Sequence, residues 1–196
     1  RDTLLTMSYM GTDAIVMRHS AEGAPLYATK AVDPIIINAG DGAHEHPTQA
    51  LLDMYSILEK KKSIEGLKVV ILGDIMHSRV ARSNIYGLTK MGADVHLAGP
   101  RTMVYPEFEK LGVTVHHDIR EAVADADVVN VLRIQLERIH SALYPTNREY
   151  ARIFGINNDI LKLAKDDVMV MHPGPMNRGL EIAPDVAYSD QSVIQE

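Results

Sequence analysis

Two kinds of hydrophobic pattern alternate along the chain. Short apolar runs predict strands, and apolar residues spaced three or four apart predict helices. Strands are predicted at residues 13–17, 34–38, 68–73, 93–98, 113–117, 127–132 and 168–171. Helices are predicted at residues 21–32, 47–62, 78–91, 107–111, 119–126 and 157–165. Strands that alternate with helices are typical of α/β proteins, in which helices cover both faces of parallel sheets.

A polar interruption divides this alternation. Residues 60–62 are three consecutive lysines. The segment 60–66, which starts with them and ends in a glycine, breaks the helical pattern. We place a domain boundary there, so the sequence predicts two subdomains, at 1–62 and 63–196. The segment at 135–147 has no clear pattern, and its length suggests a functional loop.

Composition narrows the class of protein. Hydrophobic residues make up 46% of the chain and charged residues 23%, as in ordinary globular proteins. There is no cysteine, which excludes disulfides and thiolate chemistry. No apolar run approaches the ~20 residues of a membrane span, and a net charge of -6 argues against nucleic-acid binding, which needs a basic face. No signal peptide is visible, so we expect a cytoplasmic protein without membrane or nucleic-acid partners.

The stretch at 38–53 carries the strongest functional signal. It follows the apolar run at 34–37, which we interpret as a buried strand, and crosses a turn rich in Gly and Asp. Pro47 suits the first position of a helix, where its missing N–H costs nothing. His46 and Gln49 therefore lie at a helix N-terminus, whose free N–H groups and dipole favour an anion. This predicts a site for a small, oxygen-rich anion.

Further polar residues follow other predicted strands. Ligands of open α/β sheets bind beyond the carboxyl ends of the strands. The candidates at these ends are Arg18 with His19, the His46 stretch, Asp74 with Arg79, Arg133 with Gln135, and the rigid turn at 172–175. Arginine forks grip carboxylates and phosphates through two hydrogen bonds. We therefore expect one site for two small anions.

Several of these residues allow other interpretations. His44 and His46 could form a metal pair, but the HExxH spacing and a further ligand cluster are absent. The turn at 73–79 joins a strand to a helix, as in dinucleotide-binding proteins, but it has one glycine where that fingerprint needs three. Asp41 and Asp74 could act as bases, although Asp beside Gly is more common in turns.

Five motifs identify a family. They are residues 17–19 (MRH), 46–49 (HPTQ), 73–83 (GDIMHSRVARS), 132–138 (LRIQLER) and 172–179 (HPGPMNRG). Together, and in this order, they resemble the catalytic chain of the aspartate carbamoyltransferases over essentially the whole sequence. The related ornithine carbamoyltransferases have a Cys in the turn that matches 172–175. Because this chain has no Cys, and has Arg79 and Arg133, the resemblance favours the aspartate branch.

The resemblance implies a fold, a reaction and a site. The fold is that of the aspartate/ornithine carbamoyltransferases. The reaction transfers the carbamoyl group of carbamoyl phosphate to the amino group of L-aspartate, which gives N-carbamoyl-L-aspartate and phosphate in de novo pyrimidine biosynthesis. It needs no metal or cofactor. The implied contacts to carbamoyl phosphate are Arg18 and His46, both catalytic, with Gln49, Pro173 and Gly174; those to aspartate are Arg79, Arg133 and Gln135. The implied assembly is a homotrimer with shared active sites, and the resemblance also allows further subunits.

The chain also departs from that family. We find neither the Ser-x-Arg-Thr-Arg loop that grips the phosphate, nor the Ser and Lys given to a neighbouring subunit, nor the last helix. We therefore expect a fragment that is inactive alone, in which 1–62 is the second half of the carbamoyl phosphate domain. Two alternatives remain: a catalytically silent subunit with a structural or interaction role, and a nucleotide-binding α/β module.

Overall fold

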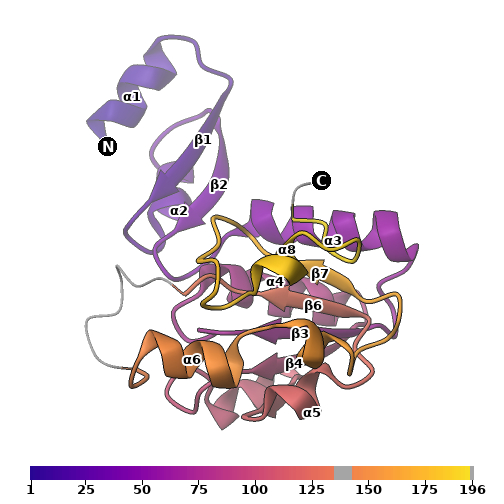
Figure 1. Ribbon diagram of the computed structural model, residues 1–196. Helices are drawn as coiled ribbons and strands as arrows, with labels where there is room; N and C mark the ends of the chain where they lie inside the picture. Colours follow the sequence, from indigo (N-terminus) through magenta and orange to yellow (C-terminus); the bar gives the residue numbers. More distant parts are fainter. Residues whose placement is uncertain (135–142, 195–196) are drawn as a thin grey trace.

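Two parallel sheets organise the molecule (Figure 1). The computed structural model describes residues 1–134 and 143–194. In the smaller sheet, β1 (Ala14–His19) pairs in parallel with β2 (Ile35–Asp41). The short helices α1 (Asp2–Tyr9) and α2 (Ala24–Thr29) accompany this sheet. The fold class predicted from the sequence, an α/β protein with parallel sheets, is confirmed.

The larger sheet has five parallel strands in the order β5-β4-β3-β6-β7. They are β3 (Lys68–Leu72), β4 (Asp94–Ala98), β5 (Thr114–His116), β6 (Val128–Val131) and β7 (Met169–Met171). Successive strands are added on one side of β3 as far as β5, and the next strand, β6, pairs with β3 on its other side. The direction of winding therefore reverses between β3 and β6. In open α/β sheets a crevice forms at this point, beyond the carboxyl ends of the strands.

Helices cover both faces of the larger sheet. On one face, the core takes side chains from α3 (Pro47–Lys61), α4 (Arg79–Lys90) and α6 (Asn147–Phe154). On the other, it takes them from α5 (Ile119–Val123), α7 (Asn158–Leu161) and α8 (Pro184–Ala187). The 3-10 helix η1 (Pro106–Leu111) precedes β5. Strands buried on both faces need apolar residues at consecutive positions, which explains the unbroken apolar runs in the sequence.

Some elements differ from the sequence prediction. The strand at 34–37 was expected to be buried, but Ile35 is 69% exposed and Ile37 is 39% exposed. Only alternate side chains of β2 can face α2, and Ile35 and Ile37, which point the other way with Val16 of β1, stay exposed. The helices predicted at 21–32 and 157–165 are real but shorter. The helices α1, α6 and α8 were not predicted.

Helix α3 leads from the end of β2, which it still contacts, onto the larger subdomain, where it packs mainly against α4 (Figure 1). Its N-terminus is tied to α4, because the backbone N–H of His46 donates to Ser83 Oγ at 2.9 Å. Its C-terminus pairs with the segment just before β7, where Lys61 Nζ lies 2.8 Å from Asp167 Oδ2. The helix therefore follows the small sheet in sequence and packs on the large one.

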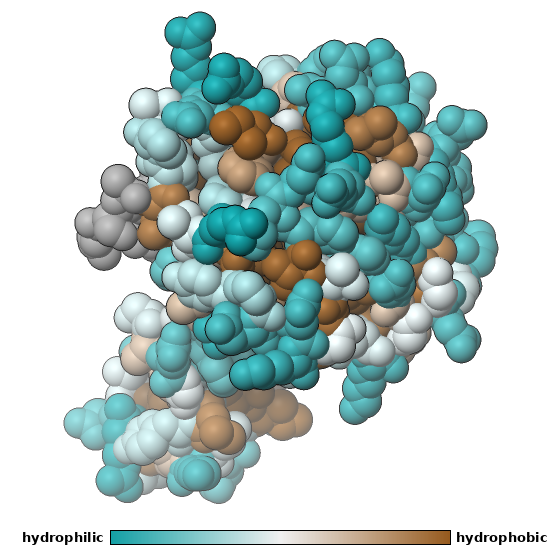
Figure 2. Space-filling model, turned by 90° about the horizontal axis from the view of Figure 1, so that it is seen from below, coloured by the Kyte–Doolittle hydropathy of each residue, from teal (hydrophilic) through white to brown (hydrophobic). Residues whose placement is uncertain are grey.

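The surface is mostly hydrophilic on the face shown in Figure 2, with apolar side chains in separate groups. Among the described residues, no helix combines the length and the apolar character of a membrane span. The same part of the chain has no group of three or more His, Asp or Glu side chains arranged to hold a metal ion.

Candidate active site

A cavity of about 220 Å³ lies between the small sheet and the larger one. The described residues that the family resemblance implies as substrate contacts all line it: Arg18, His46, Gln49, Arg79, Arg133, Pro173 and Gly174. Two other strand-end candidates, His19 and Asp74, do not line it. Gln135, the remaining candidate, lies outside the described residues, as does most of the predicted loop at 135–147. Pro175, from the predicted turn at 172–175, lines it too, and three further lining residues were not singled out: Ser78, Val80 and Leu132.

The fold explains why distant motifs meet here. Arg18 lies on β1 near its carboxyl end, and His46 precedes the first residue of α3. Arg79 begins α4 after β3, and Arg133 follows β6. Because β3 and β6 are neighbours at the winding reversal, these two arginines reach the same crevice. The turn with Pro173 and Gly174 follows β7, the next strand along.

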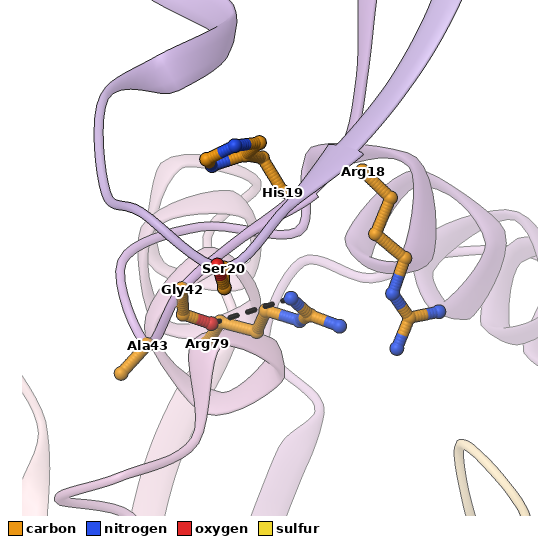
Figure 3. A pocket seen from close by; sticks show the side chains of 6 residues that line it. All are labelled: Arg18, His19, Ser20, Gly42, Ala43 and Arg79. Atoms are coloured by element: carbon orange, nitrogen blue, oxygen red, sulfur yellow. Dashed lines mark hydrogen bonds between the residues drawn. The ribbon is translucent and has the colours of Figure 1, made fainter.

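A second hollow, of about 420 Å³, shares two arginines with the first cavity (Figure 3). Arg18 and Arg79 line both spaces, so the two are adjacent, and Figure 3 shows both guanidinium groups extending to the same side of the turn. Arg79 Nη1 donates to the carbonyl of Gly42 at 3.3 Å. Gly40 has φ +117°, and a Cβ there would lie 2.8 Å from Arg79 Cζ. Glycine at this position therefore permits the close approach of Arg79.

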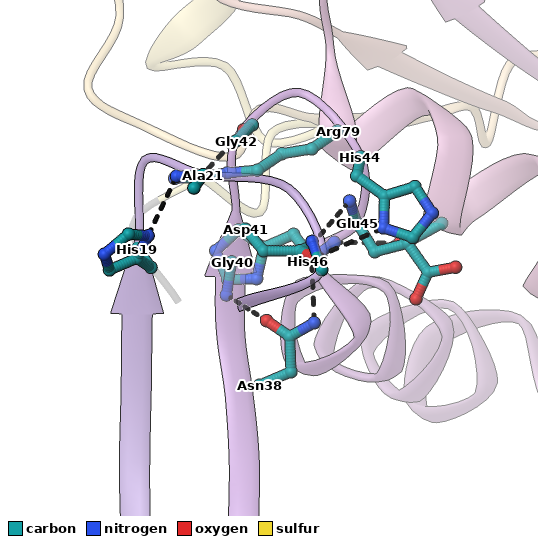
Figure 4. Close-up of polar contacts among 12 residues, drawn as sticks. His19, Ala21, Asn38, Gly40, Asp41, Gly42, His44, Glu45, His46 and Arg79 are labelled. Atoms are coloured by element: carbon teal, nitrogen blue, oxygen red, sulfur yellow. Dashed lines mark hydrogen bonds and ion pairs between the residues drawn. The ribbon is translucent and has the colours of Figure 1, made fainter. Parts of the chain in front are cut away.

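A buried carboxylate shapes the turn that leads to His46 (Figure 4). Asp41 accepts hydrogen bonds from the backbone N–H groups of Gly23 at 2.8 Å and Glu45 at 2.9 Å, and His44 Nδ1 lies 3.2 Å away. Burial alone would raise the pKa of Asp41, but these hydrogen bonds, with one from Asn38, lower it below its ordinary value. A carboxylate so engaged holds a turn, which disfavours its use as a base.

His46 presents a half-buried imidazole to the cavity. Its carbonyl accepts the first backbone hydrogen bonds of α3, from Gln49 and Ala50. Burial, together with the positive charges of Arg79 and Arg18, lowers the pKa of His46 below 6.5. Thr48 Oγ1 lies 3.3 Å from His46 Nδ1. When the Thr48 hydroxyl donates there, the proton of the neutral ring stays on Nε2, so the ring can donate one hydrogen bond to a ligand.

We expect the His46 imidazole to titrate below pH 6.5, and so to be neutral at pH 7. Because the neighbouring guanidinium disfavours the imidazolium, Arg79→Gln should raise the pKa of His46. NMR titration of the His46 ring measures both values. The control is Arg120→Gln, on the exposed side of α5, which should leave the pKa unchanged. A His46 pKa at or above 6.5 in the unsubstituted protein would contradict the expectation.

A buried network holds the turn at 172–175. His172 and Glu181 have side chains 0% and 1% exposed, and His172 Nε2 lies 3.1 Å from Glu181 Oε1. The N–H of Gly174 donates to His172 Nδ1 at 2.9 Å, which leaves the ring proton on Nε2, facing the Glu181 carboxylate. Asn177 Nδ2 donates to the carbonyl of Ile134 at 2.8 Å. The network thereby anchors this turn to the segment that carries Arg133.

Comparison with known proteins identifies the family. The family model described as the Asp/Orn binding domain of aspartate/ornithine carbamoyltransferase matches residues 65–196, and the one described as its carbamoyl-P binding domain matches residues 1–59. The chain belongs to the aspartate/ornithine carbamoyltransferase family. This confirms the family predicted from the five motifs.

The curated relatives that the chain matches carry the name of the aspartate branch. The chain is 59% identical, over all 196 of its residues, to the aspartate carbamoyltransferase catalytic subunit of Desulforamulus reducens. It is equally similar, at 59%, to the protein of the same name from Ruminiclostridium cellulolyticum. The chain spans 63% and 62% of the lengths of these two relatives.

Solved structures agree with the fold. Aspartate transcarbamoylase from Trypanosoma cruzi, solved with carbamoyl phosphate and aspartate, matches with a TM-score of 0.82 at 29% identity. Ornithine carbamoyltransferase from Pyrococcus furiosus matches with a TM-score of 0.83 at 33% identity. Both matches cover 98% of this chain and 64% of the other.

Proposed function

We propose that the protein transfers the carbamoyl group of carbamoyl phosphate to the amino group of L-aspartate, which yields N-carbamoyl-L-aspartate and phosphate in de novo pyrimidine biosynthesis. The observation that carries this proposal is one cavity that brings together His46, Gln49 and three arginines, one from β1 and two from segments that follow β3 and β6. Such a cavity suits two anionic substrates. Relatives that are 59% identical over the whole chain are named for this activity.

The carbamoyl phosphate side uses Arg18, His46 and Gln49. The aspartate nitrogen attacks the carbamoyl carbon, the bond from that carbon to the phosphate oxygen breaks, and phosphate leaves with the electron pair and takes up the proton from nitrogen. Negative charge builds on the carbonyl oxygen in the tetrahedral intermediate. The neutral His46 ring donates its Nε2–H to that oxygen, and Arg18 adds positive charge. A preorganised donor of this kind contributes about 3–4 kcal/mol.

The aspartate side uses Arg79 and Arg133. Each guanidinium offers a planar fork to one substrate carboxylate, and both lie at the winding reversal between β3 and β6. Gln135 belongs to the same proposal by family resemblance. The backbone carbonyls of Pro173 and Gly174 accept hydrogen bonds from the carbamoyl amine group. Holding both reactants at attack distance supplies much of the remaining rate enhancement.

The family contains two branches, so the test offers two acceptors. The complete polypeptide that carries this chain is incubated with carbamoyl phosphate and either L-aspartate or L-ornithine, and the carbamoylated product is measured. We expect carbamoyl aspartate and no carbamoyl ornithine. Carbamoyl ornithine would assign the protein to the other branch, and no product with either acceptor would favour a catalytically silent subunit.

A homotrimer with shared active sites and a cytoplasmic location are further parts of this proposal, which the family resemblance supports.

A further inference from the structure

A buried carboxylate beside the cavity has no part in the reaction described above. Asp53 lies on α3, one turn after Gln49, and is 5% exposed. Side-chain amides donate to it from three elements: Gln49 Nε2 at 2.8 Å on α3, Asn84 Nδ2 at 2.6 Å on α4 and Asn130 Nδ2 at 3.3 Å on β6. Asp53 thus connects a cavity-lining residue to two elements of the larger sheet layer.

The three amides all turn their N–H groups toward Asp53, as an ionised carboxylate requires, because it can only accept hydrogen bonds. Burial raises the pKa of Asp53, and the hydrogen bonds from Asn84, Gln49 and Asn130 oppose that rise. In turning toward Asp53, the two asparagines leave their Oδ1 atoms buried without a hydrogen-bond partner among the described residues. Unpaired buried acceptors reduce stability, so packing alone does not account for this cluster.

The cluster determines which end of the Gln49 side-chain amide faces the cavity. A glutamine amide has a donor end and an acceptor end. Because Asp53 takes the Nε2 end, the Oε1 end remains as an acceptor for a ligand of the cavity that Gln49 lines. Without the carboxylate, the amide could rotate by half a turn and present Nε2 instead.

We propose that Asp53 is a positioning residue of the active site: Asn84 and Asn130 hold its carboxylate, and the carboxylate holds the Gln49 amide so that Oε1 accepts an N–H of the carbamoyl amine group. This inference rests on the proposed function. It assigns substrate selection to Asp53, because an acceptor at this place favours a ligand with an amine over one with a methyl group. Carbamoyl phosphate has that amine, and acetyl phosphate has a methyl group in its place.

Binding of these two acyl phosphates tests the inference. Dissociation constants are measured for the complete polypeptide, Asp53→Asn, Gln49→Ala and the double variant. We expect Asp53→Asn to weaken carbamoyl phosphate binding about 10-fold or more, the scale of one charge-assisted hydrogen bond, and to change acetyl phosphate binding much less. In the Gln49→Ala background, Asp53→Asn should have little further effect on either ligand, because the residue that it positions is gone.

A matched control separates positioning from the general cost of neutralising a buried carboxylate. Asp127 is 6% exposed and precedes β6, at the end of the strand opposite to the cavity, where it accepts from the Lys68 N–H at 2.9 Å. Asp127→Asn should leave the ratio of the two dissociation constants unchanged. If Asp53→Asn does not fold, Asn84→Ala replaces it in the cycle, since it removes the shortest hydrogen bond to the carboxylate.

Three results would overturn the inference: equal weakening of both ligands, additive effects of the Asp53 and Gln49 substitutions, or no binding of carbamoyl phosphate by the unsubstituted protein. Failure of the proposed function has a different signature. If the unsubstituted protein binds carbamoyl phosphate and forms no carbamoyl aspartate, the transferase proposal fails, and the binding ratio still decides the role of Asp53.

Discussion

Substituting His46 by alanine is expected to lower kcat by about 10²- to 10³-fold, the usual cost of removing one oxyanion donor. His46 lines the cavity, and burial with the charges of Arg79 and Arg18 lowers its pKa, which favours the neutral imidazole. Its hydrogen bond strengthens as the carbonyl oxygen becomes an anion, so the loss should fall on the chemical step. The KM for aspartate should change little, since the aspartate carboxylates are assigned to other residues.

Steady-state kinetics of the complete polypeptide, with each substrate varied in turn, measures these changes. His44→Ala is the matched control, because His44 lies two residues away in the same turn and does not line the cavity. It should keep kcat within a few-fold of the unsubstituted value. An unchanged kcat in His46→Ala would remove His46 from the mechanism and leave it with a packing role.

Arg133→Lys should cost about 2–4 kcal/mol in kcat/KM for aspartate. Lysine keeps the positive charge but cannot reproduce the planar fork, so one substrate carboxylate is desolvated without its full set of hydrogen bonds. Carbamoyl phosphate binding should be nearly unchanged, because the side chains proposed to bind it are those of Arg18, His46 and Gln49.

Separate titration of the two substrates distinguishes the possible outcomes. Arg152→Lys, on the exposed side of α6, provides a matched exchange outside the cavity and should leave both substrates unaffected. If Arg133→Lys damages both substrates equally, or only carbamoyl phosphate, the assignment of Arg133 to aspartate is wrong.

Local patterns predicted much of the larger sheet. The strands at 68–73 and 127–132 are rich in apolar residues, and in the structure both faces of β3 and β6 are buried. The start of α3 at Pro47 was predicted because proline suits that position. Helix α6 was missed although its signal was present: Thr146 precedes Glu149 by three residues, and its Oγ1 accepts from the N–H of Glu149 at 3.1 Å.

Other features depend on contacts that no local pattern contains. The apolar run at 34–37 has the pattern of a buried strand, but burial depends on what packs against it, and Ile35 and Ile37 stay exposed. The motifs that line the cavity were recognisable one by one, and their meeting requires the strand order around β3 and β6. Asp53 lies in the stretch at 38–53, the most informative part of the sequence, but the sequence alone predicted no role for it. Two of its partners, Asn84 and Asn130, are 31 and 77 residues away in sequence.

The packing of α3 bears on how such chains can be recombined. A chimera of two relatives joined at residues 62–66, where the hydrophobic pattern breaks, would inherit Asp53 from one parent and Asn84 and Asn130 from the other. The contacts from His46 to Ser83 and from Lys61 to Asp167 would be split in the same way. A crossover just before His46, in the turn after β2, keeps all of these pairs within one parent. By these contacts the unit inherited from one parent begins at about residue 46, and helix α3 stays with α4, on which it packs; the hydrogen bond from Arg79 to Gly42 still crosses that junction.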